Sequence, residues 1–237
     1  MKVLSRLSPN TQNGIVVNLT PCFAATKTDK DHDAAAMAHD YFNRWYLDPI
    51  LTGHYPSLFD TLIQDHDLVD LVKTGDLEAI NQAVDFVGVN YYTKSTFCAD
   101  SEQGFRAREP FGTELTDMGW EIYPKGLTEI LTWLNDTYSM PPIYITENGA
   151  AMPDEEVNGE INDVRRTAYF QSHLNAVEEA IKAGVNIKGY FAWSLMDNFE
   201  WAEGYEKRFG IVWVDFKSQT RIIKASGKAY QQMLASR

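Results

Sequence analysis

A glutamate stands at the end of a short apolar run in the stretch Tyr-Ile-Thr-Glu-Asn-Gly-Ala, which contains Glu147. An ionised carboxylate in such a position can attack an electrophilic carbon or accept a proton, so Glu147 is a candidate nucleophile or base. The Asn-Gly pair that follows is a common turn sequence, and the segment alone fits an ordinary turn residue equally well. Its place among the predicted strands has to decide between the two interpretations.

A second group of candidate residues lies in the stretch Trp-Ser-Leu-Met-Asp-Asn-Phe-Glu-Trp, from Trp193 to Trp201. Indole rings stack on the flat apolar faces of sugar rings, and a carboxylate such as Glu200 can accept two hydroxyl hydrogen bonds. The alternative is a set of core aromatic residues with one solvated acid. The two indoles beside a carboxylate favour a sugar-binding subsite formed by Trp193, Glu200 and Trp201.

Strands and helices alternate along the chain. Short apolar runs typical of buried parallel strands are predicted at 14–20, 85–93, 143–146 and 187–195. Helices are predicted between and beside them, at 29–51, 58–63, 76–84, 124–136 and 163–183, with Asp163 as the cap of the last. Strand and helix in alternation require right-handed crossovers and a parallel sheet. The sequence therefore predicts an α/β fold with four parallel βα units.

Three further segments have a less regular pattern. The polar stretch Lys94–Gly119 is predicted as a long surface loop. Phe209–Phe216 is predicted as a rim hairpin, followed by a closing helix from Ser226. The helix at 29–51 is expected to bury one apolar face made of Met37, Tyr41, Phe42, Trp45 and Tyr46.

The carboxyl ends of the predicted strands carry polar or aromatic residues. In a parallel α/β barrel these ends face the active site. The residues found there are Asn18, Asn90 with Tyr92, Glu147 with Asn148, and Trp193. A phenol such as that of Tyr92 can hold a neighbouring carboxylate ionised, which suits a nucleophile. This position favours the nucleophile interpretation of Glu147.

Composition excludes several classes of partner. The chain has 21 basic and 33 acidic residues among 237, a formal net charge of -12, which argues against nucleic acid and anionic membranes. No apolar run approaches the roughly 18 residues of a membrane span, and the start lacks a secretory apolar segment.

Cys22 and Cys98 lack metal-ligand spacing and are expected to be reduced thiols of a cytoplasmic protein.

Several long stretches resemble the C-terminal half of a family 1 glycoside hydrolase of the β-glucosidase type. They include Asn-Leu-Thr-Pro, Asp-Phe-Val-Gly-Val-Asn-Tyr-Tyr-Thr and Tyr-Ile-Thr-Glu-Asn-Gly, the long run from Asp163 to Phe216, and Arg-x-x-Lys-x-Ser from Arg221 to Ser226. Motifs of this length and order are far more specific than a lone short pattern. The resemblance extends from about Leu7 onward and implies one domain, residues 1–237, that forms half of a (β/α)8 TIM barrel.

The resemblance also implies roles for individual residues. Glu147 would be the nucleophile of a retaining β-glycoside hydrolase, and Tyr92 would hydrogen-bond to it. The residues that would bind the glycon sugar are Asn90, Trp193, Glu200, Trp201 and Phe209. Relatives that act on 6-phosphorylated glycosides lack a glutamate at the position of Glu200, so a free, unphosphorylated sugar is expected. No metal or cofactor is implied, because the two-carboxylate mechanism needs none.

One part of the family pattern is missing. Retaining hydrolysis needs two carboxyl groups about 5 Å apart, a nucleophile and an acid/base. In family 1 the acid/base lies in an Asn-Glu-Pro motif at the end of the fourth strand, and this sequence contains no such motif. Arg-Glu-Pro at 108–110 lies within the predicted loop, and Glu109 is not expected to be catalytic. Glu200 also ends a strand beside Glu147, but it is better explained as a sugar ligand.

A half barrel would leave two open sheet edges and an interior facing water. The chain is therefore expected to bind a complementary N-terminal half-barrel chain, or to associate with itself. Three interpretations stay open. The chain is half of a two-chain β-glycosidase, a carbohydrate-binding half barrel without catalysis, or an inert fragment.

Overall fold

A central parallel sheet organises the chain in the computed structural model, which describes residues 2–65 and 71–235. Its strands are β1 (Gly14–Asn18), β3 (Phe86–Asn90), β6 (Ile143–Asn148) and β9 (Ile187–Ala192). They lie in the order β1-β3-β6-β9, and each neighbouring pair is parallel. The predicted α/β class with a parallel sheet is confirmed.

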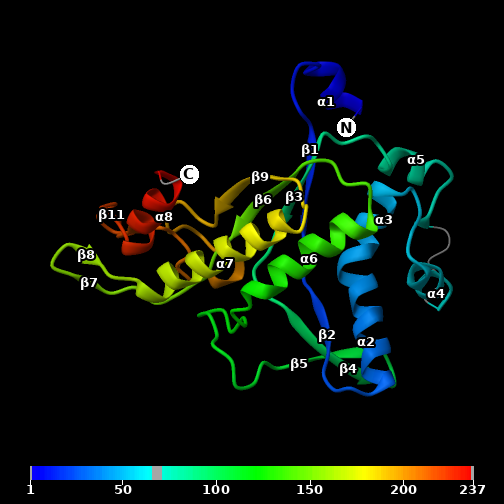
Figure 1. Ribbon diagram of the computed structural model, residues 1–237, viewed down its shortest axis with the longest axis horizontal. Helices are drawn as coiled ribbons and strands as arrows, with labels where there is room; N and C mark the ends of the chain where they lie inside the picture. The colour runs from blue at the N-terminus through cyan, green and yellow to red at the C-terminus, as the bar shows by residue number, and fades with distance from the viewer. Residues whose placement is uncertain (1, 66–70, 236–237) are drawn as a thin grey trace.

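Helices cover one face of this sheet (Figure 1). α6 (Pro124–Thr137) and α7 (Val164–Lys182) pack against each other across the strands. The core between the layers contains fully buried strand and helix residues: Val87, Val89, Ile143, Ile145, Leu127, Leu131 and Leu134. Alternate strand residues supply the core because successive side chains point to opposite faces of a sheet.

The other face of the sheet is open. The prediction of strands that are buried on both faces is therefore wrong for the two outer strands, β1 and β9. Val16 is 49% exposed and Phe191 is 57% exposed. On this face the ring of Phe86 lies over Gly14, and the ring of Tyr144 lies over Gly189. A Cβ added at Gly14 would lie 2.4 Å from the Phe86 ring, and one added at Gly189 would lie 2.8 Å from the Tyr144 ring. Four strands do not close a barrel, and the side chains that would fill its interior therefore meet water.

The first long helical segment is interrupted. It consists of α2 (Asp29–His39), a π-helical turn η1 (Asp40–Arg44) and α3 (Trp45–Leu51). The predicted apolar face is wrong in part, because Tyr41, Phe42 and Tyr46 are 44%, 39% and 57% exposed. The π turn shifts the helical register, and the small residues Ala34, Ala35 and Ala38 make the buried side instead.

The stretch predicted as a long surface loop contains a β-hairpin. β4 (Ser95–Asp100) and β5 (Gly104–Arg108) pair antiparallel, and β4 also pairs with β2 (Cys22–Ala24) to form a second sheet. Phe97 is 2% exposed and packs against Phe42 and Phe105. The alternation in Thr-Phe-Cys-Ala is a strand signal that the polar neighbours obscured.

The remaining elements lie around the sheet. They are α1 (Lys2–Leu7), α4 (Ser57–Asp65), α5 (Asp76–Ile80), the hairpin β7 (Glu156–Val157) with β8 (Glu160–Ile161), the hairpin β10 (Val212–Val214) with β11 (Arg221–Ile223), and α8 (Ala225–Ala235). The closing helix is thus confirmed, and a rim hairpin is present, but Phe209–Phe216 contains only its first strand, β10, because the second strand lies beyond this range. α5 is shorter than predicted. Among the described residues, no helix is long and apolar enough to cross a membrane.

Candidate active site

The carboxyl ends of three neighbouring strands lie in register, at the side of the sheet where its parallel strands end. Asn18 of β1 pairs with Asn90 of β3, and Asn90 pairs with Glu147 of β6. Backbone bonds continue the alignment beyond the strands: the N–H of Leu19 donates to the Asn90 carbonyl, and that of Tyr91 donates to the Glu147 carbonyl. The strands therefore bring side chains that are distant in sequence to one place.

Glu147 is half-buried and accepts a hydrogen bond from the phenol of Tyr92 at its Oε2. Burial raises the pKa of Tyr92 far above its usual value, and the hydrogen bond to Glu147 and its charge raise it further. Tyr92 therefore stays protonated and acts as a donor. A phenol donor of this kind stabilises the ionised carboxylate and orients it.

Two aromatic rings, those of Trp120 and Phe209, pack beside Tyr92. The ring of Tyr92 lies 5.4 Å from Trp120 and 6.2 Å from Phe209, and Trp120 lies 6.2 Å from Phe209. Phe209 is among the site residues that the sequence predicts, but Trp120 is not, and it lies in an irregular segment after the β4–β5 hairpin. Its one sequence signal is a position shortly before the helix that leads into β6.

The two residues after Glu147 have structural roles. Asn148 is fully buried, donates to the Tyr91 carbonyl (2.7 Å) and the Tyr169 hydroxyl (2.9 Å), and accepts from the Tyr190 hydroxyl (2.6 Å). At Gly149 an added Cβ would lie 1.8 Å from the Trp193 carbonyl oxygen. The Asn-Gly pair thus locks β6 to β9 and permits the close approach of the two strand ends.

The segment after β9 places Glu200 within electrostatic reach of Glu147. Burial raises the pKa of Glu200, a hydrogen bond with Trp193 opposes this, and the charge of Glu147 raises the pKa further. Trp193 follows the last residue of β9 and is half-buried. Trp201 begins a single 3-10 turn after Glu200 and is 82% exposed.

Asn90 is held at the same edge by its neighbour on β6, because the hydroxyl of Thr146 donates to Asn90 Oδ1 at 2.6 Å. Of the predicted site residues, the described contacts connect Glu147 with Tyr92, Tyr92 with Phe209, and Glu200 with Trp193. Glu109 lies elsewhere, after β5 of the second sheet, and is exposed.

Within residues 2–65 and 71–235, no group of three or more His, Cys, Asp or Glu side chains could hold a metal ion. The two cysteines are free thiols. Burial raises the pKa of Cys22 to about 12, so this thiol is not activated as a nucleophile.

The arrangement can be compared with known proteins. The family model described as glycosyl hydrolase family 1 matches residues 1–237. Beta-glucosidase A of Acetivibrio thermocellus is 41% identical over 99% of this chain and 53% of its own length. The crystal structure of the β-glucosidase from Exiguobacterium antarcticum superposes with a TM-score of 0.94 at 38% identity, over 99% of this chain and 54% of that one.

A third relative has a bound sugar compound. The virulence factor SghA of Agrobacterium tumefaciens, solved with its substrate analog salicin, superposes with a TM-score of 0.92 at 36% identity. The match covers 98% of this chain and 52% of SghA. The chain thus spans about half the length of the relatives that it matches, and its parallel sheet corresponds to about half of their TIM barrel. On this evidence of sequence and fold, the chain belongs to glycosyl hydrolase family 1.

Proposed function

We propose that the chain is the C-terminal half of a retaining β-glycosidase barrel and supplies its nucleophile, Glu147. The observation that carries this proposal is the hydrogen bond from the Tyr92 phenol to Glu147 at the carboxyl edge of a parallel sheet. The edge is the catalytic side of TIM barrels. An ionised, oriented carboxylate at that edge is what attack on a sugar requires.

In the proposed reaction, a carboxylate oxygen of Glu147 attacks the anomeric carbon of a β-glycoside. The bond from that carbon to the leaving oxygen breaks, and the leaving oxygen takes a proton from an acid/base carboxyl group. Water, deprotonated by the same group, then attacks the anomeric carbon and releases Glu147 as a free carboxylate. Two inversions at the anomeric carbon give net retention.

The glycon subsite is proposed to lie between Glu147 and the segment after β9. The indole of Trp193 would stack on the sugar ring, and Glu200 would accept hydrogen bonds from two of its hydroxyls. A negative charge at Glu200 would repel a phosphate group, which favours an unphosphorylated sugar. Asn90, Trp201 and Phe209 would complete the subsite.

The acid/base is proposed to come from the half of the barrel that these 237 residues do not span. Glu109 is a poor substitute because it lies just beyond β5 of the second sheet and is exposed. Glu200 is assigned to the sugar hydroxyls. A proton donor within about 5 Å of Glu147 would complete the retaining pair.

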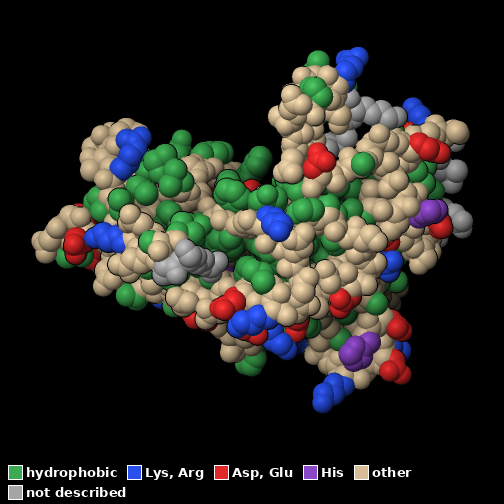
Figure 2. Space-filling view, turned by 45° about the horizontal axis from the view of Figure 1, so that its top comes forward, with side chains coloured by type: hydrophobic (Ala, Val, Ile, Leu, Met, Phe, Trp, Pro, Cys, Tyr) green, Lys and Arg blue, Asp and Glu red, His purple; other side chains and the backbone are tan. Residues whose placement is uncertain are grey.

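The open face of the sheet is the proposed docking surface for a complementary half barrel. In the described residues β1 and β9 are the outer strands, so each has one edge without a partner in this sheet. On this face Val16 of β1 and Phe191 of β9 are 49% and 57% exposed. Figure 2 shows hydrophobic side chains gathered over the upper face of the molecule, with most charged groups toward its margins. Four further parallel strands would cover both edges and this surface.

Complementation tests the proposal. The chain is mixed with the N-terminal half of the Acetivibrio thermocellus relative, and hydrolysis of an aryl β-glucoside is measured. Activity is expected only in the mixture, and E147Q should abolish it while E109Q, the matched control, should leave it intact. Binding of glucose without turnover in any mixture would instead support a carbohydrate-binding half barrel. Equal activity of the E147Q mixture would contradict the nucleophile assignment.

A further inference from the structure

A cluster of buried charges, called here the charge cluster, lies behind the candidate active site. Five of its side chains are at most 2% exposed: Asp154, Asp163, Arg166, Asp197 and Lys224. Arg208, with its side chain 21% exposed, adds a cation next to Asp197. Three carboxylates are thus matched by three cations.

Lys224 joins two carboxylates that come from different segments. Its Nζ lies 2.5 Å from Asp154 Oδ2 and 2.8 Å from Asp197 Oδ1. Lys224 and Ser226 are the Lys and Ser of the Arg-x-x-Lys-x-Ser motif, which the proposed chemistry does not use. Ser226 in turn donates from its backbone N–H (2.8 Å) and its hydroxyl (2.5 Å) to Asp163.

On one side the charge cluster fixes the segment that follows Glu147. Arg166 donates to Asp154 Oδ1 at 2.8 Å and to the carbonyls of Ala150 (3.3 Å) and Met152 (3.0 Å). Residues 150–154 follow the Glu147–Gly149 turn directly, so these bonds fix the segment that follows β6, the strand that carries Glu147.

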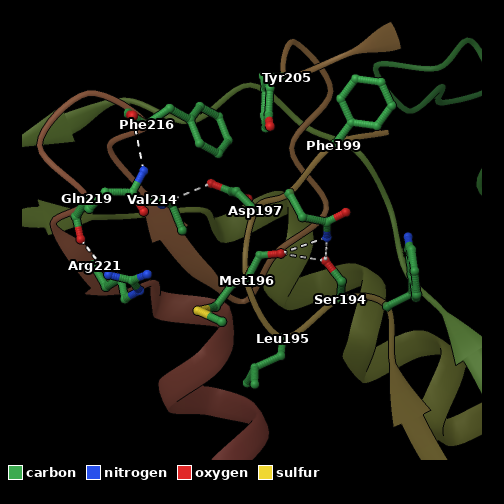
Figure 3. A pocket seen from close by; sticks show the side chains of 12 residues that line it. Ser194, Leu195, Met196, Asp197, Phe199, Tyr205, Val214, Phe216, Gln219 and Arg221 are labelled. Carbon is green, nitrogen blue, oxygen red and sulfur yellow. Dashed lines mark hydrogen bonds between the residues drawn. The ribbon is translucent and has the colours of Figure 1, made fainter. Parts of the chain in front are cut away.

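On the other side the charge cluster fixes the segment that carries Glu200. Asp197 accepts from Arg208 (2.6 Å) and from the backbone N–H groups of Gly210 (3.0 Å) and Val214 (3.3 Å). Asp197 is one of the residues that line a pocket of about 660 Å³. Figure 3 shows Asp197 near Val214 among the side chains of this pocket. Asp197 lies between Trp193 and Glu200 in the chain, so both sugar-binding groups depend on its anchorage.

Burying such charges costs about as much as their pairing returns, and apolar residues of the same volume are often equally stable. Stability alone is therefore a weak reason for a charge cluster at this place. Geometry gives a stronger one, since Lys224 links the two loops that bear the opposing parts of the site.

We propose that Lys224 is a positioning residue that sets the separation between Glu147 and the Trp193–Glu200 pair. This inference rests on the proposed function for its effect on sugar binding. Replacing Lys224 by Met leaves the carboxylates of Asp154 and Asp197 facing each other without the cation between them. The two loops then separate or admit water, and Glu200 moves relative to the nucleophile.

The effect should appear in binding more than in the chemical step. Misplacing Glu200 loses hydrogen bonds to a charged group, which corresponds to roughly ten- to hundredfold in affinity. We expect K224M to raise the KM of the complemented enzyme by roughly tenfold or more, with kcat changed less. K228M, in the helix α8 that begins directly after Lys224, is the matched control, because Lys228 is exposed, with its side chain 59% accessible.

A double variant separates positioning from stability. K224M/D154N removes one charge of each sign, so the remaining cluster is again balanced and thermal stability should recover toward that of the parent. The bridge to Asp197 is still absent, so KM should stay raised. Recovery of both stability and KM would overturn the positioning role.

Hydrogen–deuterium exchange on the chain alone supplies a test that does not depend on activity. We expect faster exchange in residues 149–154 and 194–204 of both Lys224 variants and parental exchange in K228M. Unchanged exchange in both segments would overturn the proposal. Faster exchange together with an inactive parental mixture would instead count against the proposed function and leave the positioning of the two loops supported.

Discussion

At the scale of the residue, the candidate site depends on a hydrogen bond between groups 55 residues apart, from Tyr92 to Glu147. The sequence predicts both residues at the carboxyl ends of parallel strands, and the resemblance to family 1 implies the hydrogen bond between them. It did not predict that Asn148 would turn into the core, because three partners from distant segments decide its orientation. Trp120 is not predicted either, because no periodic pattern marks its segment.

Removing the phenol of Tyr92 tests the pair directly. Tyr92→Phe keeps the ring but loses the hydrogen bond to the carboxylate, which is worth roughly 1.5–3 kcal/mol. We expect the kcat/KM of the complemented enzyme to fall by about ten- to hundredfold, with little change in melting temperature. Tyr46→Phe, at a ring 57% exposed, is the control and should have no effect. An unchanged kcat/KM in Tyr92→Phe would contradict the role given to this bond.

A pH-dependent loss of stability follows from His173, which is fully buried in α7 and stacked on Tyr169. Burial lowers its pKa from 6.5 to about 4. Between these values the unfolded chain binds a proton that the folded chain does not, so the free energy of unfolding falls as the pH falls from 6.5 to 4. The loss amounts to about 3 kcal/mol and is absent above this range.

Denaturant unfolding at a series of pH values measures this dependence. His173→Gln should reduce the slope between pH 6.5 and 4, whatever it does to the stability at neutral pH. Part of the slope should remain, because burial also lowers the pKa of His39 to about 4. His32→Gln, at an exposed histidine, should keep the full slope. An identical slope in His173→Gln would show that the buried histidine is not its source.

At the scale of the element, the strongly periodic segments were predictable and the short polar ones were not. β3, β6, α6 and α7 lie close to the predicted ranges, because long apolar patterns identify them. The sequence predicts a loop where the β4–β5 hairpin lies, because the alternation of the hairpin spans few residues among polar neighbours. The π turn in the first helical segment has no simple sequence signal, and it moved Tyr41 and Phe42 away from the expected buried face.

The presence of the hairpin leads to a testable prediction about stability for the stretch Lys94–Gly119. Phe97 is 2% exposed among aromatic rings, so Phe97→Ala should lower the free energy of unfolding by about 3 kcal/mol or more. Phe111, in the same stretch, is 98% exposed, and Phe111→Ala should change it by less than about 0.5 kcal/mol. Thermal or urea unfolding compares the two. Equal small effects would mean that the stretch is the surface loop that its composition suggests.

At the scale of the whole molecule, the sheet corresponds to about half of a barrel, and this explains features that are otherwise unfavourable. The two outer strands and the exposed apolar side chains of the open face would be a liability in an isolated sheet. Motif order in the sequence was sufficient to predict the parallel sheet. The extent of the open face was visible only in the structure, because it depends on which side chains the helices cover.

The most direct test of the central claim is covalent trapping of Glu147. The chain mixed with a complementary half barrel is treated with a dinitrophenyl glucoside that has fluorine in place of the hydroxyl next to the anomeric carbon. Its leaving group needs no protonation, and the fluorine slows hydrolysis of the glycosyl-enzyme, which accumulates. Peptide mass spectrometry should find one fluoroglucosyl group on Glu147 in the parent and in E109Q, and none in E147Q. A label on Glu200 or another carboxylate, in a mixture that hydrolyses aryl glucosides, would contradict the account.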